Sequence, residues 1–78
     1  MEEWRVEISN KAWKHIIKFE KKIQIELIET LRMLKFFPFP RNLDIKKIKG
    51  TRNVFRIRKG KIRILYLVDE KRRIVEIL

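Results

Sequence analysis

The stretch Val54-Phe-Arg-Ile-Arg-Lys-Gly-Lys-Ile-Arg-Ile-Leu-Tyr66 alternates apolar and basic residues in two runs around a central Lys59-Gly60. Such alternation is typical of β-strands with one buried face, and a glycine after a short polar break predicts a tight hairpin. A turn on Lys59 and Gly60 predicts three cross-strand pairs: Arg58 with Lys61, Arg56 with Arg63, and Phe55 with Ile64. Because side chains alternate between faces, one face of the hairpin carries four cations: Arg56, Arg58, Lys61 and Arg63.

The two faces of this hairpin predict different environments. The apolar face needs a covering layer from elsewhere in the chain, and it consists of Phe55, Ile57, Ile62, Ile64 and Tyr66. On the basic face, like charges directly opposite each other destabilise a sheet. Although most charged strand faces are simply solvated, this arrangement favours phosphate binding, so we interpret the basic face as an anion site.

Length and composition restrict the class of protein. The 78 residues are 45% hydrophobic and 40% charged, which predicts one folded domain over residues 1–78. The chain has no cysteine and one histidine, so we expect neither a disulfide framework nor a thiolate or histidine-rich metal site. No run approaches the roughly 18 apolar residues of a membrane span, and we expect a cytoplasmic protein without a membrane partner.

Positive charge is concentrated in the second half of the chain. Residues 1–40 carry 8 basic and 6 acidic side chains, whereas residues 41–78 carry 13 basic and 4 acidic ones. This asymmetry predicts a polyanionic partner, most simply nucleic acid, although an acidic protein satisfies the same electrostatics. Five cations are candidates for extending a phosphate track, with a solvated surface as the alternative: Lys46, Lys47, Lys49, Arg52 and Lys61.

The first half predicts one strand and two helices. Residues 4–8 alternate as a strand, and Ser9 or Asn10 offers a helix N-cap. A first helical stripe begins at Lys11, and we place in the core its apolar members Ala12, Trp13, Ile16, Ile17 and Phe19. A second stripe follows a break at residues 20–22, and it contains Ile23, Leu27, Ile28, Leu31 and Leu34. One long helix is the alternative to this helical hairpin.

The second half predicts a sheet. Pro38 and Pro40 end the second helix, and the aromatic residues around them are expected to cap the core. Residues 43–50 are expected to be irregular or a short turn of helix. The hairpin of residues 54–68 and a turn at residues 69–72 lead to a last strand, with Val68 opposite Arg73 and Leu78 beside Arg63. The predicted fold is α+β: an N-terminal strand, a two-helix hairpin and a three-stranded antiparallel meander, with the helices packed on one face of a mainly antiparallel sheet.

Three further polar residues receive structural rather than catalytic interpretations. His15 lies on the predicted helical layer, which covers the face opposite the arginines, so we expect a surface histidine. Tyr66 falls on the apolar face, which predicts a buried ring with a hydrogen-bonded hydroxyl. Glu76 falls on the basic face, where it is expected to act as a counter-charge.

The whole chain resembles the RelE/ParE superfamily of toxins from toxin–antitoxin pairs, particularly its RelE branch. The resemblance rests on Trp4-Arg-Val-Glu-Ile8, the two amphipathic helices, Ile45-Lys-Lys-Ile-Lys-Gly50, and the Arg-x-Arg and Arg-x-x-Tyr spacings within residues 55–66. It implies a ribosome-dependent messenger RNA endonuclease that drives a ribose 2′-hydroxyl onto the adjacent phosphate without a metal or other cofactor. It also implies three partners, namely a cognate antitoxin, the ribosome and messenger RNA.

The resemblance also implies roles for three arginines. Arg56 and Arg58 match positions that engage the scissile region and help proton transfer, while Arg63 matches the arginine that stabilises charge on the phosphate. RelE-type chains usually continue into a tail with a further arginine and often a tyrosine, whereas this sequence stops at Leu78. The resemblance therefore assigns no general base in this sequence, and it does not decide whether the chain is catalytically active. The alternatives are a non-catalytic RNA- or antitoxin-binding module of the same fold and a ParE-like poison of DNA gyrase.

Overall fold

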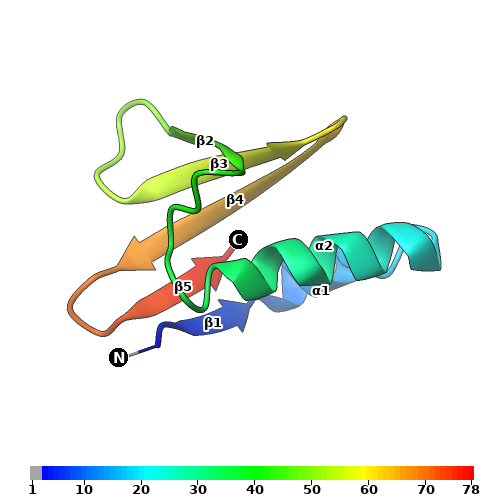
Figure 1. Ribbon diagram of the computed structural model, residues 1–78, viewed down its shortest axis with the longest axis horizontal. Coiled ribbons are helices and arrows are strands. Elements are labelled where there is room, and N and C mark those ends of the chain that lie inside the picture. The colour runs from blue at the N-terminus through cyan, green and yellow to red at the C-terminus, as the bar shows by residue number, and fades with distance from the viewer. Residues whose placement is uncertain (1–2) are drawn as a thin grey trace.

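A computed structural model describes residues 3–78 as two helices and a five-stranded sheet (Figure 1). The elements are β1 (Arg5–Ile8), α1 (Asn10–Ile16), α2 (Lys21–Met33), β2 (Asp44–Lys47), β3 (Val54–Lys59), β4 (Ile62–Asp69) and β5 (Ile74–Ile77). The strand order is β1-β5-β4-β3-β2, in which β1 is parallel to β5 and the other neighbours are antiparallel. The predicted α+β class and the mainly antiparallel sheet are confirmed.

The sheet contains one strand that the sequence did not predict. Residues 43–50 were expected to be irregular, but Asp44–Lys47 form β2, an edge strand that pairs with β3. Only Ile45 in this strand is half-buried, and the other three residues are exposed. The alternation of apolar and polar residues was therefore too short to predict a strand. The strand forms because β3 presents an open edge of backbone donors and acceptors. The predicted three-stranded meander is therefore a four-stranded one.

The central hairpin turns one residue later than predicted. Gly60 and Lys61 form the two-residue connection, and Lys59 pairs with Ile62. Gly60 is the first of the two turn residues. Its φ of 61° lies in the left-handed region, which a residue without a Cβ atom adopts at no steric cost. The observed partners are Arg58 with Arg63 and Arg56 with Leu65, which corrects the predicted pairs. Because the pairing register changes by two residues, the side chains of both strands keep their predicted faces. Lys61 is the exception, because it lies in the turn instead of facing Arg58 from the second strand.

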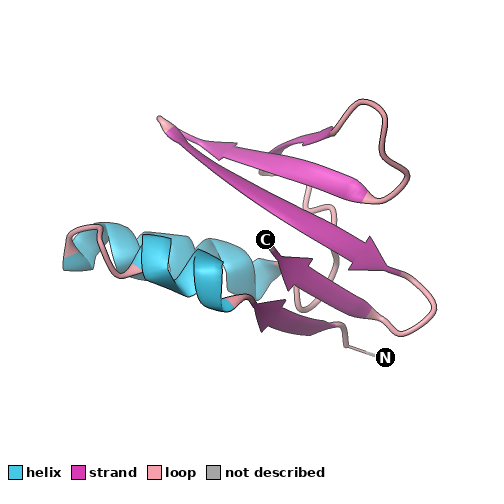
Figure 2. Cartoon of the chain, turned by 180° about the vertical axis from the view of Figure 1, so that it is seen from behind, coloured by secondary structure: helices cyan, strands magenta, loops and turns pink. Residues whose placement is uncertain are grey.

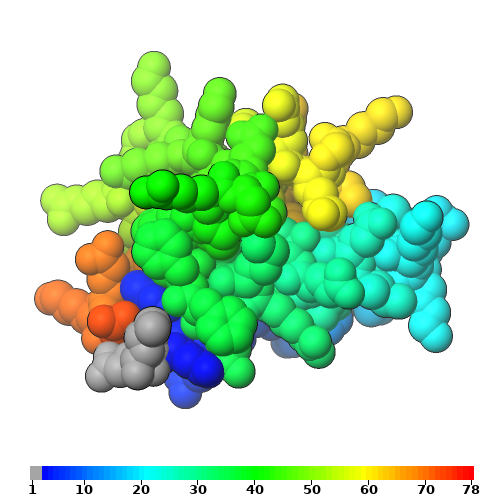
Figure 3. All heavy atoms as spheres, in the orientation of Figure 1, coloured from blue at the N-terminus to red at the C-terminus, as the bar shows by residue number. Residues whose placement is uncertain are grey.

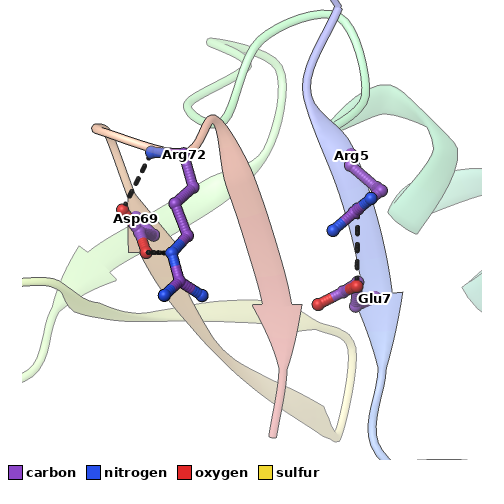
Figure 4. A network of polar contacts seen from close by, with 4 residues as sticks. All are labelled: Arg5, Glu7, Asp69 and Arg72. Atoms are coloured by element: carbon purple, nitrogen blue, oxygen red, sulfur yellow. Dashed lines mark hydrogen bonds and ion pairs between the residues drawn. The ribbon is translucent and has the colours of Figure 1, made fainter.

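The connection between β4 and β5 is also longer than predicted. Val68 pairs with Val75 rather than with Arg73, and Leu78 donates its backbone N–H to the Leu65 carbonyl at 2.9 Å rather than lying beside Arg63. The reason lies in the turn, where the Asp69 carboxylate accepts one hydrogen bond from the Arg72 backbone N–H and lies near the Arg72 guanidinium (Figure 4). Residues 70–73 thereby form the turn instead of pairing.

The two helices form the expected hairpin, with different boundaries. Ser9 caps α1 by accepting a hydrogen bond from the Ala12 backbone at 3.0 Å. The break spans residues 17–20, not 20–22, and the Gln24 side chain closes it by donating to the Phe19 carbonyl at 2.8 Å. The alternative of one long helix is therefore wrong.

The first helix buries less of its apolar stripe than predicted. Ala12 and Ile16 are in the core, whereas three other members of the stripe are exposed: Trp13, Ile17 and Phe19. The core position predicted for Trp13 is wrong, because a helix of seven residues brings only one pair spaced by four residues against the sheet.

The core lies between the helices and one face of the sheet. Leu27, Leu31 and Leu34 pack against a cluster of sheet residues formed by Ile57, Tyr66, Val68, Val75 and Ile77. Burial of each such leucine contributes about 1.5–3 kcal/mol. On the opposite side of the sheet, no helix of residues 3–78 lies in front of β3 and β4 (Figure 2). The helices therefore cover one face, as predicted, and leave the other face open.

The connection from α2 to β2 crosses the helix-side face of the sheet (Figure 1). Pro38 is fully buried, and Phe39 packs edge-on against Phe55 with 4.7 Å between ring centroids. Phe36 and Phe37 are exposed, so only part of this aromatic loop caps the core as expected. Within residues 3–78, no helix is long and apolar enough to cross a membrane.

Candidate nucleic-acid interface

The open face of the sheet carries the predicted arginines. Ile57 is fully buried on the helix side, so its strand neighbours Arg56 and Arg58 project from the other side. Tyr66 is likewise buried, which puts Arg63 and Leu65 on the open face of β4. The sequence-based prediction of faces is therefore confirmed for all three arginines.

Strand pairing brings four cations together at one end of the open face. Arg58 lies directly opposite Arg63, and Arg56 lies opposite Lys46 on β2. The predicted conflict of like charges therefore exists, but it joins Arg58 to Arg63 rather than Arg56 to Arg63. Repulsion between opposed guanidinium groups favours an anion that neutralises both. In the structure the basic face therefore consists of Lys46, Arg56, Arg58 and Arg63, with Lys46 in place of the predicted Lys61.

Arg56 is the most enclosed member of the basic face. Its side chain is half-buried between β2 and β4, whereas Arg58 and Arg63 are exposed. The Arg56 Nε atom is buried and has no hydrogen-bond partner among the described residues. A buried donor without an acceptor costs about 1–3 kcal/mol. A phosphate oxygen is the kind of acceptor that guanidinium donors prefer, and guanidinium geometry suits a bidentate contact with phosphate.

Asp44 is a functional candidate that the sequence analysis missed. Its carboxylate lies 3.0 Å from Arg58 Nε, and the register places it directly opposite Arg58. The predicted counter-charge, Glu76, instead lies opposite Leu67 and beside Glu7 on β1. In the sequence, Asp44 begins a short alternation of polar and apolar residues. That alternation indicates a position near Arg58 only once β2 is known to pair with β3.

The structure separates the remaining basic candidates from the basic face. Lys47 lies opposite Phe55, so it projects from the helix side of the sheet. Lys49 and Arg52 are exposed on the connection between β2 and β3, and Lys61 is exposed in the hairpin turn. Long side chains of these two segments stand away from the surface in light green and yellow (Figure 3). They form separate positive projections, not one continuous track.

Tyr66 has the structural environment that the sequence predicted. Its hydroxyl donates a hydrogen bond to the Pro38 carbonyl at 2.7 Å, and its side chain is fully buried. Burial raises the pKa of the Tyr66 phenol well above its usual range, because the phenolate would lose its hydration. Tyr66 therefore stays neutral at physiological pH and lies on the side of the sheet opposite the arginines.

Other titratable groups add little to the basic face. His15 is exposed on α1, as predicted. Among the side chains of residues 3–78, no group of three or more His, Cys, Asp or Glu is arranged to hold a metal ion. The guanidinium and ammonium groups of the basic face can stabilise negative charge and donate hydrogen bonds to an anion.

Comparison with known proteins gives one sequence relative and two structural neighbours of note. No protein-family model matches the chain. Over 44 residues it is 50% identical to the protein named "Putative toxin RelE1" from Methanocaldococcus jannaschii, in a match covering 55% of this chain and 46% of that protein. The chain thus spans about half the length of this curated relative.

The structural neighbours cover more of the chain. An archaeal RelE–RelB complex from Pyrococcus horikoshii contains a chain that superposes with a TM-score of 0.87 at 28% identity, covering 100% of this chain and 91% of that one. A double arginine-to-alanine mutant of the E. coli toxin RelE, in the free state, superposes with a TM-score of 0.75 at 17% identity, covering 96% and 78%. At 17% identity, the second likeness concerns the fold alone.

Proposed function

This chain belongs to the RelE superfamily, and from that premise we propose that it is the toxin of a type II toxin–antitoxin pair that cleaves messenger RNA on the ribosome. The observation that carries the proposal is the basic face. Three arginines project from the uncovered side of the sheet, and the most enclosed of them has a buried donor without a protein acceptor. Such a site is built for a phosphate rather than for internal stability.

The proposed reaction is an internal transfer at one phosphodiester. The ribose 2′-hydroxyl loses its proton as its oxygen forms a bond to the adjacent phosphorus. The bond from phosphorus to the 5′-oxygen breaks and that oxygen gains a proton, which leaves a 2′,3′-cyclic phosphate and a free 5′-hydroxyl. Arg63 stabilises the charge that builds on the phosphate oxygens, and Arg56 and Arg58 hold the scissile region and assist proton transfer. Lys46, opposite Arg56, contacts the RNA backbone beside the scissile phosphate. The more distant cations contact the backbone farther away: Lys47, Lys49, Arg52 and Lys61.

The partner we propose is an antitoxin that covers the basic face in the cytoplasm. Leu65 and Leu78 are adjacent on the open face, and 42% and 43% of their respective surfaces are exposed. Leu65 also lies directly opposite Arg56. An amphipathic antitoxin segment packs its apolar side on these leucines and its acidic side on the arginines. Its release exposes the basic face to the ribosome and messenger RNA.

Cleavage of messenger RNA on programmed ribosomes tests the catalytic proposal. We expect specific products from the full chain and none from Arg63→Ala, with unchanged circular dichroism. Arg72→Ala is a matched control, because Arg72 is exposed in the turn before β5, away from the basic face. Removing one phosphate contact should also lower the salt slope of RNA binding by about one in Arg63→Ala only.

Each other outcome of this test identifies a different function. A folded, fully active Arg63→Ala variant contradicts the proposed role of the basic face. Tight RNA binding without products favours the non-catalytic binding module. Intact messenger RNA together with trapped, cleaved complexes of DNA and gyrase favours the gyrase poison.

A further inference from the structure

One edge of the sheet has backbone groups without a neighbouring strand. β1 is the outermost strand beside β5, at the end of the sheet opposite β2. The Arg5 N–H donates to the Arg73 carbonyl at 2.9 Å, and the Ser9 N–H donates to the Ile77 carbonyl at 3.1 Å. Because backbone direction alternates along a strand, the N–H and C=O groups of Val6 and Ile8 face away from β5. No strand of the described chain lies on that side.

The end of α2 occupies only the beginning of this edge. The Trp4 N–H has the same direction as those of Val6 and Ile8, and it donates to the Lys35 carbonyl at 2.8 Å. Beyond Trp4, a hollow of about 370 Å³ lies between β1 and α2. Its apolar lining comes from both elements and includes Val6, Ile8, Ile28 and Leu31. The edge therefore combines free backbone groups with an apolar floor.

Three cations also line this hollow: Arg5, Arg32 and Lys35. Arg5 contacts Glu7 at 3.4 Å on β1 (Figure 4), and Lys35 contacts Glu3 at 3.3 Å. At least half of each of these side chains is exposed, and exposed ion pairs hold their partners weakly. A carboxylate from another chain can therefore replace either partner. Arg32, in the last turn of α2, has no ion pair with the described residues.

We propose that the free edge of β1 and the adjacent hollow form a docking site for an extended acidic segment of a partner protein. The segment adds a sixth strand beside β1 through the backbone groups of Val6 and Ile8. Alternate side chains that are apolar enter the hollow, and acidic side chains reach the cations at its rim. A nucleic acid offers no strand backbone for this edge and no aliphatic side chains for the hollow, so the geometry favours a peptide.

This docking site is independent of the proposed RNA cleavage. β1 is at one edge of the sheet, and β5 separates it from the strands β4, β3 and β2 that carry the basic face. A chain that fails to cleave RNA can still bind a peptide at β1, and an active interferase can lack this site. An experiment that contradicts one of these two proposals therefore leaves the other intact.

Nuclear magnetic resonance titration of the full chain tests the docking site. The probe is a synthetic peptide of alternating glutamate and valine, and the matched control peptide has lysine in place of glutamate. We expect the acidic peptide to shift the Val6 and Ile8 amide resonances and to slow their hydrogen exchange, while the lysine peptide leaves both unchanged. No binding at millimolar acidic peptide, equal binding of the two peptides, or shifts confined to the basic face would overturn the proposal.

Two sets of variants separate the backbone and charge contributions. Val6→Pro removes an edge donor without removing a bond to β5, and Val6→Ala controls for the lost side-chain packing. We expect Val6→Pro to bind the acidic peptide about fivefold more weakly than Val6→Ala does. The double variant Arg32→Glu/Lys35→Glu should weaken binding about tenfold. Its control is Lys11→Glu/Lys14→Glu, which makes the same change in net charge at exposed positions on α1. Equal affinities within either comparison, in folded proteins, would overturn the proposed binding geometry.

Discussion

Removal of the Tyr66 hydroxyl gives the sharpest test of how the core holds the loop that precedes β2. Tyr66 on β4 and Pro38 in the loop are 28 positions apart, and their hydrogen bond of 2.7 Å is buried. Tyr66→Phe keeps the ring and its contact with Phe55, whose centroid lies 5.8 Å away. The substitution therefore isolates one hydrogen bond between the sheet and the loop.

The expected cost follows from the group that is left behind. In Tyr66→Phe, the Pro38 carbonyl stays buried without its donor, which costs about 1–3 kcal/mol. A domain of this length has a total unfolding free energy of about 4–12 kcal/mol. The variant should therefore fold, with a clearly reduced midpoint of chemical unfolding.

Alkaline pH gives the same substitution a second signature. Burial raises the pKa of Tyr66 in the folded state, whereas the unfolded chain has the ordinary tyrosine pKa of about 10. Above that pH the unfolded state loses its proton first, so it binds fewer protons than the folded state does. The unfolding free energy of the wild type then falls by up to about 1.4 kcal/mol per pH unit, until the pH passes the folded-state pKa. Tyr66→Phe lacks this contribution.

Urea unfolding of both proteins from about pH 7 to about pH 11 measures both effects. We expect the wild type to be more stable at neutral pH and to lose that advantage progressively above about pH 10. Tyr66 is the only tyrosine, so tyrosinate absorbance reports its ionisation directly in the folded protein. Equal stability at neutral pH would refute the energetic role of the hydrogen bond. A parallel decline of both proteins, or tyrosinate formation at the ordinary pKa in the folded state, would refute the raised pKa.

Three further predictions concern the α1 cap, the central hairpin turn and the basic face. Ser9→Ala should lower the unfolding free energy by about 1 kcal/mol because α1 loses its cap, and no change in the urea midpoint would contradict this. Gly60→Ala should cost about 1–2 kcal/mol from backbone strain alone, since φ is +61° and nothing lies within 4 Å of an added Cβ atom. A Gly60→Ala protein as stable as the wild type in thermal unfolding would argue against this strain. Asp44→Asn should change stability by less than about 1 kcal/mol, because the pair with Arg58 is exposed, but should tighten RNA binding at low salt. Weaker binding of RNA to this variant, measured by fluorescence anisotropy, would show that Asp44 organises the basic face instead of competing with RNA.

The residues of the basic face show how far the sequence could be used. Alternation alone placed Arg56, Arg58 and Arg63 on one face and Tyr66 on the other, and both assignments are confirmed. The pairing of Arg58 with Arg63 was not predicted, because it depends on which residue occupies the turn. The enclosure of Arg56 was also not predictable, since β2 and β4 create it from two sides.

The sequence by itself determined which side chains share a face, because alternation is a local property of the extended backbone. It also determined the presence of two helices and an α+β class, since periodicity changes from 2 to 3.6 along the chain. Only the tertiary structure decided the pairing register, the formation of the additional strand β2 and the parallel pairing of β1 with β5. Those features depend on turn geometry and on edges supplied by distant segments. The same dependence explains why Asp44 lies beside Arg58 of the basic face, whereas Lys47 projects from the other side of the sheet.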